Sequence, residues 1–427
     1  MNYTEALDYL DSLGKFGIRL GMERIEGLLK ELGNPENKIK TIHVAGTNGK
    51  GSVASMITNI LLASNLRVGK FTSPHLVKYN ERIELNGKDI SDEDFAALIE
   101  QTKKAADEIV RKKVCDNPTQ FEILTAAAFL FFAEQKVDYA VIEVGLGGLW
   151  DSTNVITPVV SVITNVTLDH TDRLGKDLPH IAMQKAGIIK EKVPLVTAAK
   201  GEEVLGPIVS VAMFKQAPVY LYGKAFRGEE KSSTMAGQKF TLYAGNNYQS
   251  EYEISLPGEH QIKNAALAIV AAKIVSKQDD RINEVALHIG AAHTKWSGRL
   301  ERISENPDII LDGAHNPDGA KILRQALDKF YPNQKRTFVL GMMADKDMDE
   351  VIKILFQNED KIFTVQADAG TRAAKAEDLA KRCGKNAVAM PSIKDAYQSA
   401  LQNNDGVIII CGSLYLVGNF KKQYEKN

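Results

Sequence analysis

Residues 39–53, Ile-Lys-Thr-Ile-His-Val-Ala-Gly-Thr-Asn-Gly-Lys-Gly-Ser-Val, decide the fold. Thr41–Val44 is rich in β-forming residues, and a glycine-rich turn follows it directly. Apolar residues then recur at helical spacing, which predicts a helix over Val53–Ala63. A phosphate-binding loop requires this order, because its glycines let several N–H groups face inward and the helix start adds a positive dipole end. The candidate phosphate contacts are Gly46, Thr47, Asn48, Gly49, Lys50, Gly51 and Ser52.

The turn departs from the usual G-x-x-x-x-G-K-[ST] pattern, which would place glycine at Val44 and a hydroxyl at Gly51. The hydroxyl comes one residue late, at Ser52. The alternative is a tight strand-to-helix turn with a solvated lysine. Three glycines, a lysine and a hydroxyl in one such turn favour phosphate binding, with Lys50 reaching the β- and γ-phosphate oxygens.

Composition limits the class of protein. A chain of 427 residues is too long for one ordinary core, so we expect two or more domains. The 53 basic and 54 acidic residues balance, which gives no indication of a nucleic-acid partner. The N-terminus does not resemble a signal peptide, and residues 126–133, the longest apolar run, are too few to span a membrane. Three widely spaced cysteines fit a cytoplasmic protein without disulfides.

Three ionisable residues follow or lie near buried segments. Glu143 lies near the end of the most apolar strand, Asp138–Val144, where a carboxylate commonly orders magnesium. An exposed glutamate at the strand end is an equal alternative. His170 stands beside two acids and is able to ligate a metal, although a hydrogen-bonded turn histidine is the plainer alternative. Lys185, in the predicted helix Ile181–Ile189, is either a surface lysine or a buried amine of lowered pKa.

The middle of the chain changes character. The segments Pro218–Tyr222, Lys239–Tyr243 and Tyr252–Leu256 alternate between polar and apolar residues and are separated by polar turns, which predicts a small antiparallel sheet. An alanine-rich helix is expected over Asn264–Lys273.

A hinge at residues 296–300 separates a first domain, residues 1–295, from a second, residues 301–427. Strands then alternate with helices, which indicates a mostly parallel, Rossmann-like sheet. These strands are expected at Ile309–Leu311, Arg336–Leu340, Lys361–Val365, Ala387–Ala389 and Val407–Ile410. The predicted fold class is α/β: an N-terminal P-loop domain with a parallel sheet and a small antiparallel sheet, then a C-terminal Rossmann-like domain.

Ten short motifs follow one another along nearly the whole chain. They are Gly46–Ser52, Thr72–His75, Asn80–Arg82, Glu143–Gly148, Asp151–Asn154, Leu168–His170, Lys185–Lys190, His260–Asn264, Gly298–Arg299 and Asp312–Gly319. In this order they resemble the folylpolyglutamate synthases, which are related to the Mur peptide ligases. Each fragment alone is weakly specific, but ten in order are highly specific. The late hydroxyl at Ser52 is what the phosphate loop of this family looks like.

The resemblance implies that residues 1–295 form an ATP-binding ATPase domain of the Mur-ligase type and that residues 301–427 form a Rossmann-like ligase domain. It also implies that the site lies in the cleft between these two α/β domains and that the chain is an ATP-driven ligase. A carboxylate of a reduced folate, either tetrahydrofolate or its methylene form, attacks the γ-phosphate of ATP, and the α-amine of L-glutamate then attacks the resulting acyl phosphate. ATP and Mg²⁺ at two sites are the implied cofactors, with a monovalent cation as a further candidate. We expect a monomer, because no exposed heptad or large apolar face stands out.

The resemblance also assigns residues to roles. The candidate catalytic residues are Lys50, Lys185, Asp312 and His315. The expected metal ligands are Ser73, Glu143, His170 and a carbamylated Lys185. Beyond the phosphate loop, the expected ATP contacts are Asn264, Arg299 and Asp312. The expected substrate contacts are Arg82, Phe121 and Asp151, and Trp150 is a second aromatic candidate for stacking on the pterin.

Several of these assignments have alternatives. Asp312 is also placed to cap the helix that starts near Pro317. A bifunctional enzyme would act on dihydropteroate as well, and the loop Leu149–Asp151 would border the pterin. A cell-wall Mur ligase would carry an extra N-terminal domain, for which fewer than ~45 residues leave no room. A P-loop nucleotide switch would not need the second domain, and a dehydrogenase would need a better glycine pattern.

Overall fold

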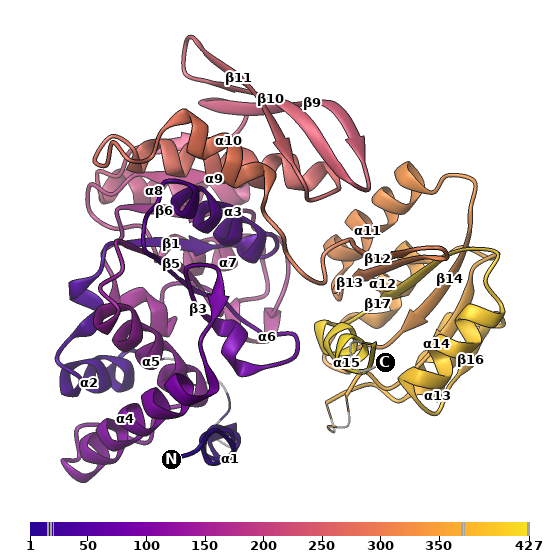
Figure 1. Ribbon diagram of the computed structural model, residues 1–427, viewed down its shortest axis with the longest axis horizontal. Helices are drawn as coiled ribbons and strands as arrows, with labels where there is room; N and C mark the ends of the chain where they lie inside the picture. Colours follow the sequence, from indigo (N-terminus) through magenta and orange to yellow (C-terminus); the bar gives the residue numbers. More distant parts are fainter. Residues whose placement is uncertain (15–16, 18, 20, 369, 371, 425–427) are drawn as a thin grey trace.

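The strand that precedes the phosphate loop, β1 (Thr41–Ala45), lies inside an eight-stranded sheet in the described part of the chain, between β5 and β6 (Figure 1). The computed structural model describes residues 1–427 apart from 15–16, 18, 20, 369, 371 and 425–427. The other strands, in spatial order, are β4 (Lys88–Asp89), β3 (Ile83–Leu85), β2 (Val68–Phe71), β5 (Tyr139–Glu143), and then β6 (Val160–Ile163), β7 (Leu195–Thr197) and β8 (Val219–Leu221). Among these strands, β3 runs opposite to all the others, because it pairs antiparallel with both β2 and β4.

Helices cover both faces of this sheet, which explains why its central strands are apolar throughout. In β5, Val141 packs on one face and its neighbours Ala140 and Ile142 on the other. The helices of the first face are α3 (Lys50–Ala63), α9 (Glu259–Val275) and α10 (Glu284–Ala292). Those of the second are α1 (Tyr3–Leu13), α2 (Glu23–Glu31), α4 (Asp92–Arg111), α5 (Gln120–Glu134), α7 (Leu178–Ala186) and α8 (Glu202–Phe214).

The small antiparallel sheet exists, but one of its strands was predicted wrongly. It consists, within the described residues, of β9 (Phe226–Thr234), β10 (Gly237–Ala244) and β11 (Tyr248–Ile254). The segment predicted at Pro218–Tyr222 instead forms β8, which pairs parallel to β7 at the edge of the main sheet. A half-buried edge strand alternates polar and apolar residues whether it pairs in parallel or antiparallel, so the pattern of β8 does not give its direction. The residues of β9 are mostly polar, so no apolar pattern predicted that strand.

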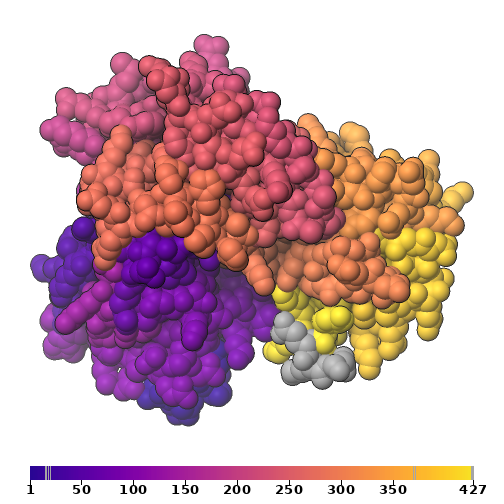
Figure 2. Space-filling view, turned by 45° about the horizontal axis from the view of Figure 1, so that its top comes forward, coloured from indigo at the N-terminus to yellow at the C-terminus, as the bar shows by residue number. Residues whose placement is uncertain are grey.

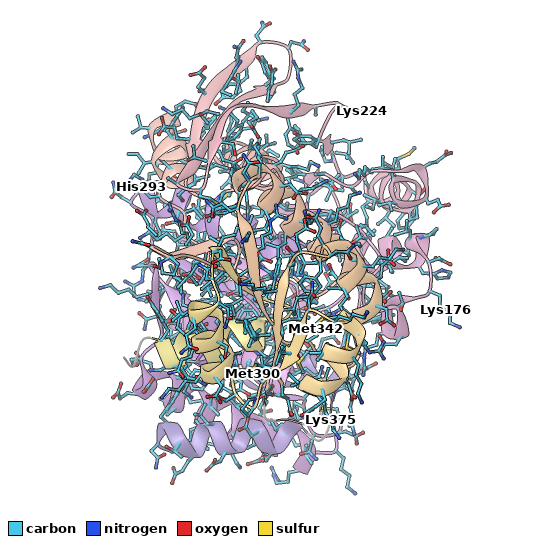
Figure 3. All side chains as sticks on the ribbon, turned by 90° about the vertical axis from the view of Figure 1, so that its right-hand side faces the viewer. Lys176, Lys224, His293, Met342, Lys375 and Met390 are labelled. Carbon is cyan, nitrogen blue, oxygen red and sulfur yellow. The ribbon has the colours of Figure 1, made fainter. Side chains whose placement is uncertain are left out.

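The C-terminal domain lies beside the first and has its own mostly parallel sheet (Figures 1 and 2). Its six described strands, in spatial order, are β12 (Glu301–Glu305), β13 (Asp308–Asp312), β17 (Gly406–Cys411), β14 (Lys335–Leu340), β15 (Lys361–Thr364) and β16 (Ala387–Ala389). The helices are α11 (Pro317–Phe330), α12 (Met348–Leu355), α13 (Ala376–Cys383), α14 (Ile393–Gln402) and α15 (Leu414–Tyr424). Figure 3 looks onto this domain, with the buried Met342 near its middle.

The structure confirms the predicted α/β class and corrects several boundaries. The antiparallel edge strand β12 was not predicted, because none of its residues is buried. Helix α7 begins earlier than predicted, at Leu178, since the Asp177 side chain accepts the N–H of His180 at 3.0 Å and caps it. Helix α9 begins at Glu259 rather than Asn264. No helix among the described residues is long and apolar enough to cross a membrane.

Candidate active site

A cleft of about 960 Å³ lies where the carboxyl ends of the strands of both domains meet. The N-terminal wall comes from the turns after β1, β2, β5 and β6, and the opposite wall from the linker and the turns after β13, β14 and β17. Ligands of open α/β sheets bind at such strand ends. The predicted site residues that line this cleft are Gly46–Ser52, Ser73, Arg82, Phe121, Glu143, Trp150, Asp151, His170, Lys185, Arg299 and His315.

The phosphate loop is held from behind by the turn after β6. Asn165 accepts the backbone N–H groups of Thr47 and Asn48 at 3.0 and 2.8 Å, and Thr164 Oγ1 donates to the Asn48 carbonyl at 2.6 Å. A Cβ at Gly46 would overlap Thr164 Oγ1, so only glycine fits there. Helix α3 begins at Lys50, and the N–H groups of its first turn therefore lack acceptors within the helix and are available to an anion.

The late hydroxyl of the loop has a steric explanation. A Cβ at Gly51 would overlap the indole ring of Trp296, which the linker lays against the start of α3. The hydroxyl at the next position, Ser52, is buried and accepts the Gln261 amide at 3.3 Å. Residue 51 therefore has no room for the side chain that the usual pattern would place there.

Glu143 lies inside the cleft rather than on the surface, which excludes the exposed strand-end alternative. Its side chain is 5% exposed, and Oε1 lies 4.0 Å from Lys50 Nζ. Oε2 accepts the backbone N–H of Ser73 at 3.2 Å. Burial raises the pKa of the Glu143 carboxyl, while the Lys50 charge and the Ser73 hydrogen bond oppose that rise. A cation in the cleft would favour the ionised form.

Lys185 is buried, 3% exposed, which excludes the surface-lysine alternative. Burial, with the nearby Lys50 charge, lowers the pKa of the Lys185 amine to about 7. The end of α7 is fixed against the glycine-rich turn after β5, since Leu149 N–H donates to the Gln184 carbonyl at 2.7 Å. A Cβ at Gly148 would lie 2.7 Å from the same carbonyl oxygen. The glycine-rich turn therefore allows the close approach that carries Lys185 into the cleft.

His170 and Asp169 precede the short helix α6 (Thr171–Leu174). His170 adopts a left-handed backbone conformation, φ 49°, and its N–H donates to Asp169 Oδ1 at 2.9 Å. Burial lowers the pKa of the His170 imidazole, which leaves the neutral form available as a ligand. Burial alone would raise the pKa of Asp169, but the nearby charges, His170 first, lower it to about 2.

The donor set fits magnesium at one position. Among the described residues, no three His, Cys, Asp or Glu side chains gather as a ready-made metal centre. Ser73 and Glu143 instead offer one hydroxyl and one carboxylate beside the phosphate loop, which suits an ion that takes its other oxygens from phosphate and water. His170 and Lys185 line the same cleft. A carbamylated Lys185 would add a second carboxylate-like donor, and the pKa of about 7 makes a neutral amine accessible for that reaction.

The three predicted substrate contacts line the cleft but differ in surroundings. Arg82 Nε lies 2.9 Å from His75 Nδ1, and its guanidinium lies 5.4 Å from the centre of the Tyr79 ring. The Phe121 ring packs beneath Gly145, where a Cβ would lie 2.5 Å from its Cζ.

The Asp151 carboxylate closes its own loop. It accepts the N–H of Leu146 at 2.8 Å, and the N–H and hydroxyl of Thr153 at 3.0 and 2.5 Å. Asp151 therefore shapes the cleft wall through its backbone contacts. Trp150, the second aromatic candidate, is 45% exposed at the cleft.

Asp312 ends β13 and His315 follows it, but the two side chains face different ways. In the described structure, Asp312 is not among the cleft residues, and its two oxygens accept the N–H groups of Leu300 and Ala314, each at 2.8 Å. His315 lines the cleft, and its Nδ1 lies 2.9 Å from the Gly313 carbonyl, so Nδ1 carries the proton and Nε2 keeps a lone pair. Burial lowers the pKa of His315 to about 4, which keeps the imidazole neutral at pH 7.

Asn264 lines a second cavity, of about 350 Å³, on the other side of the phosphate loop. Its Oδ1 would be 2.7 Å from a Cβ at Gly49, which has φ 83°. Asn48 and Gly49 line both cavities. A nucleotide that crosses the loop would therefore extend from this second cavity into the main cleft.

Sequence reasoning missed several cleft residues. Trp296, Lys346 and Lys70 all line the cleft. Lys70 is buried, pairs with Glu84 at 2.6 Å and lies 5.1 Å from the centre of the Trp296 ring. None of the three stands in a pattern that a lone sequence distinguishes from an ordinary surface residue. The turn after β17 also reaches the cleft, where Ser413 and Tyr415 line it.

Two known protein families match this chain, and together they define the class of protein. Residues 44–272 match the family described as "Mur ligase middle domain", and residues 299–423 match "Dihydrofolate synthetase, C-terminal domain". A phosphate-loop domain facing a second Rossmann-like domain across the cleft is the arrangement of a Mur-type, ATP-dependent ligase.

Individual relatives narrow this class. A Bacillus subtilis protein named dihydrofolate synthase/folylpolyglutamate synthase is 37% identical over 426 residues, covering 99% of each chain. A Lacticaseibacillus casei folylpolyglutamate synthase is also 37% identical, covering 97% of each chain. The solved Mycobacterium tuberculosis folylpolyglutamate synthase complexed with ADP superimposes with a TM-score of 0.92 at 31% identity, covering 100% of both chains. The chain belongs to the folylpolyglutamate synthase/dihydrofolate synthase family.

Proposed function

We propose that this protein uses ATP to add L-glutamate to the glutamyl tail of a reduced folate, releasing ADP and phosphate. The cleft carries the proposal: Lys50 and Glu143, 4.0 Å apart beside the phosphate loop, line one wall, and Arg299 and His315 line the other. The names of both curated relatives support the folate substrate. Tetrahydrofolate or its methylene form is the proposed acceptor.

In the first step, an oxygen of the folate carboxylate attacks the γ-phosphorus of ATP, and the bond to ADP breaks. The two anions repel each other, so the site must neutralise their charge before the atoms approach. Lys50 provides one positive charge from the phosphate loop, and Arg299 provides a second from the linker. The product is an acyl phosphate, which keeps the carbonyl carbon activated.

In the second step, the α-amine of glutamate attacks the acyl carbon, and the bond to phosphate breaks after a tetrahedral intermediate. The amine must lose a proton to become the amide. His315 Nε2 is the proposed base, because Nδ1 is held by the Gly313 carbonyl and the ring is neutral at pH 7. Arg82 is the proposed partner of a glutamate carboxylate.

Magnesium would bind Glu143 and Ser73 and neutralise the triphosphate charge. His170 and a carbamylated Lys185 are the proposed ligands of a second ion, and a monovalent cation remains a candidate cofactor. Asn264 is proposed to contact the nucleoside end of ATP in the second cavity. For Asp312 we propose an indirect role, in which its hydrogen bond to Leu300 N–H fixes the linker that carries Arg299.

A second activity, glutamate addition to dihydropteroate, is favoured by one observation: the Bacillus subtilis relative is named for both reactions. The equally similar Lacticaseibacillus casei relative is named for polyglutamylation alone. We keep polyglutamylation as the main proposed activity. The protein is further proposed to be a cytoplasmic monomer, and its three free cysteines, Cys115, Cys383 and Cys411, support a reducing compartment.

The test follows ADP release with ATP, Mg²⁺ and glutamate, adding tetrahydrofolate, its methylene form or dihydropteroate. We expect turnover with a reduced folate that depends on glutamate, and loss of that turnover in Lys50→Ala. Turnover with dihydropteroate as well would establish the bifunctional enzyme. Equal ADP release without glutamate and pterin would reject the ligase and leave a nucleotide switch.

A further inference from the structure

One carboxylate of the N-terminal domain is held by two side chains of the C-terminal domain. Lys346 Nζ lies 3.2 Å from Asp169 Oδ1, and Asn316 Nδ2 donates to Asp169 Oδ2 at 3.1 Å. Oδ1 also accepts the N–H of His170 at 2.9 Å. We call Asp169, Asn316 and Lys346 the Asp169 junction. Both oxygens of Asp169 therefore depend on the position of the other domain.

Asn316 extends this junction to the phosphate loop. Its Nδ2 also lies 3.4 Å from Asn48 Oδ1, and Asn48 Nδ2 donates to Asp318 Oδ2 at 2.7 Å. Asn316 is 4% exposed, and its Oδ1 caps α11 by accepting the Gly319 N–H at 2.8 Å. The cap fixes the orientation of the amide, so its two N–H groups face two loops of the N-terminal domain at once.

Burial makes this contact stronger than an ordinary surface ion pair. The side chains of Lys346 and Asp169 are each 13% exposed. Another ion pair between the domains, Lys329–Glu230, has exposed fractions of 39% and 33%. Salt and water screen exposed pairs, and such pairs contribute little to stability. If the C-terminal domain moved away, Asp169 and Lys346 would each lose their ion-pair partner.

We propose that Asp169 is a positioning residue that couples docking of the C-terminal domain to the placement of His170 in the cleft. The inference rests on the ligase function proposed above. His170 has the left-handed backbone conformation, which costs energy for a residue with a side chain and therefore needs support from its surroundings. Asp169 gives that support by accepting the His170 N–H, and Lys346 and Asn316 hold Asp169 only when the domains are together.

The first test uses Asn316→Asp, which keeps an acceptor for the Gly319 cap but replaces the donor to Asp169 by a second carboxylate. Lys346→Met removes the cation. We expect each change to lower kcat by about tenfold or more, with KM for ATP within about twofold of the wild-type value. Small-angle X-ray scattering of the ligand-free variants should give a larger radius of gyration, because the domains separate.

Two further variants test the pairing itself. The double variant Asp169→Asn/Asn316→Asp exchanges donor and acceptor between the two side chains but removes the carboxylate that Lys346 pairs with, so it is expected to recover part of the kcat that Asn316→Asp loses. Lys346→Arg keeps the charge and should retain more activity than Lys346→Met. Glu230→Gln, which removes the more exposed pair between the domains, is the matched control and should leave kcat unchanged.

Wild-type kcat and radius of gyration in Asn316→Asp or Lys346→Met would overturn the proposal. A double variant no more active than Asn316→Asp alone would also overturn it. If Asn316→Asp fails to fold by circular dichroism, the comparison of Lys346→Met with Lys346→Arg gives the same two readouts. A wild-type protein without folate-dependent turnover would reject the proposed function instead, whereas the scattering comparison would still decide whether the Asp169 junction holds the domains together.

Discussion

Glu143 and Asp312 share a sequence pattern but differ in what surrounds them. Each ends a buried parallel strand, β5 or β13, and burial raises the pKa of each carboxyl. Glu143 receives one backbone N–H, from Ser73, and faces Lys50 across 4.0 Å. Asp312 receives two, from Leu300 and Ala314, one on each oxygen.

This difference in hydrogen bonding distinguishes a carboxylate that binds a ligand from one that supports the local backbone. A carboxylate oxygen that accepts a short backbone hydrogen bond has less capacity to bind a ligand. Removing that oxygen lowers the stability of the fold before it affects binding. An oxygen beside a lysine at the edge of a cleft has capacity for a cation. The hydrogen bonds of an acid, more than its place at a strand end, indicate which role it has.

Glu143→Gln should have the largest effect. The amide keeps the size of the side chain and an acceptor for the Ser73 N–H, but it removes the charge beside Lys50. We expect kcat to fall by about a hundredfold or more, with little change in thermal stability. ADP-release rates and circular-dichroism melts measure both quantities. Activity within a few-fold of wild type would mean that Glu143 only supports the fold.

Asp312→Asn should act mainly on stability. The amide leaves one of the two backbone N–H groups facing an N–H₂ group instead of an oxygen. We expect the free energy of unfolding to fall by about 1–3 kcal/mol, as measured by urea denaturation. The loss in kcat should be smaller than for Glu143→Gln. Equal losses in kcat with unchanged stability would instead place Asp312 in the reaction, as the family resemblance predicted.

Gly51→Ala tests the linker, which contacts the phosphate loop near Glu143 at one end and Asp312 at the other. The linker carries Trp296, which packs on Gly51, and Leu300, whose N–H holds Asp312. The added methyl group would overlap the indole, so the linker must move, and we expect KM for ATP to rise by about tenfold. The double variant Gly51→Ala/Trp296→Leu should recover part of the loss. No recovery would mean that the methyl group disturbs the phosphate loop itself.

The smallest expected effect concerns Lys185, a buried amine whose nearby acids are Asp169 and Asp151. Its amine, with a pKa of about 7, loses its proton as the pH rises through 7, and only the neutral amine reacts with carbon dioxide. We therefore expect kcat to rise several-fold from pH 6 to pH 8 in bicarbonate and to fall again on acidification. Carbon-13 NMR with labelled bicarbonate should show a carbamate signal that Lys185→Arg lacks. A flat pH profile without that signal would contradict the carbamylated form.

The sequence predicted the parts of the fold that local patterns determine. The phosphate loop follows from a β-rich run, glycines and a lysine within residues 39–53, and from the helical spacing of apolar residues over Val53–Ala63. Strands β8 and β12 were missed or misplaced because each is an edge strand whose pairing depends on distant segments. Alternation alone does not give the direction of a neighbouring strand.

The residues of the candidate site divide in the same way, into those that a local pattern predicts and those that the packing of the domains places. Glu143, His170 and Lys185 were found because each follows or lies in a strongly apolar segment, and the structure places all three in the cleft. Trp296 and Lys346 reach the cleft from the linker and from a loop of the second domain. Their positions follow from how the two domains pack, which no local pattern carries.

The antiparallel sheet β9–β11 gives the two domains a second point of attachment. Glu230 on β9 contacts Lys329 at the end of α11, and Met235 packs on the core of the C-terminal domain. The peptide linker is the first point of attachment. These two attachments alone leave the C-terminal domain rotation about the line that joins them, and the Asp169 junction opposes that rotation when the domains are together. Opening of the cleft would then be a twist with one principal degree of freedom, which limits the range of shapes that the site presents to its substrates.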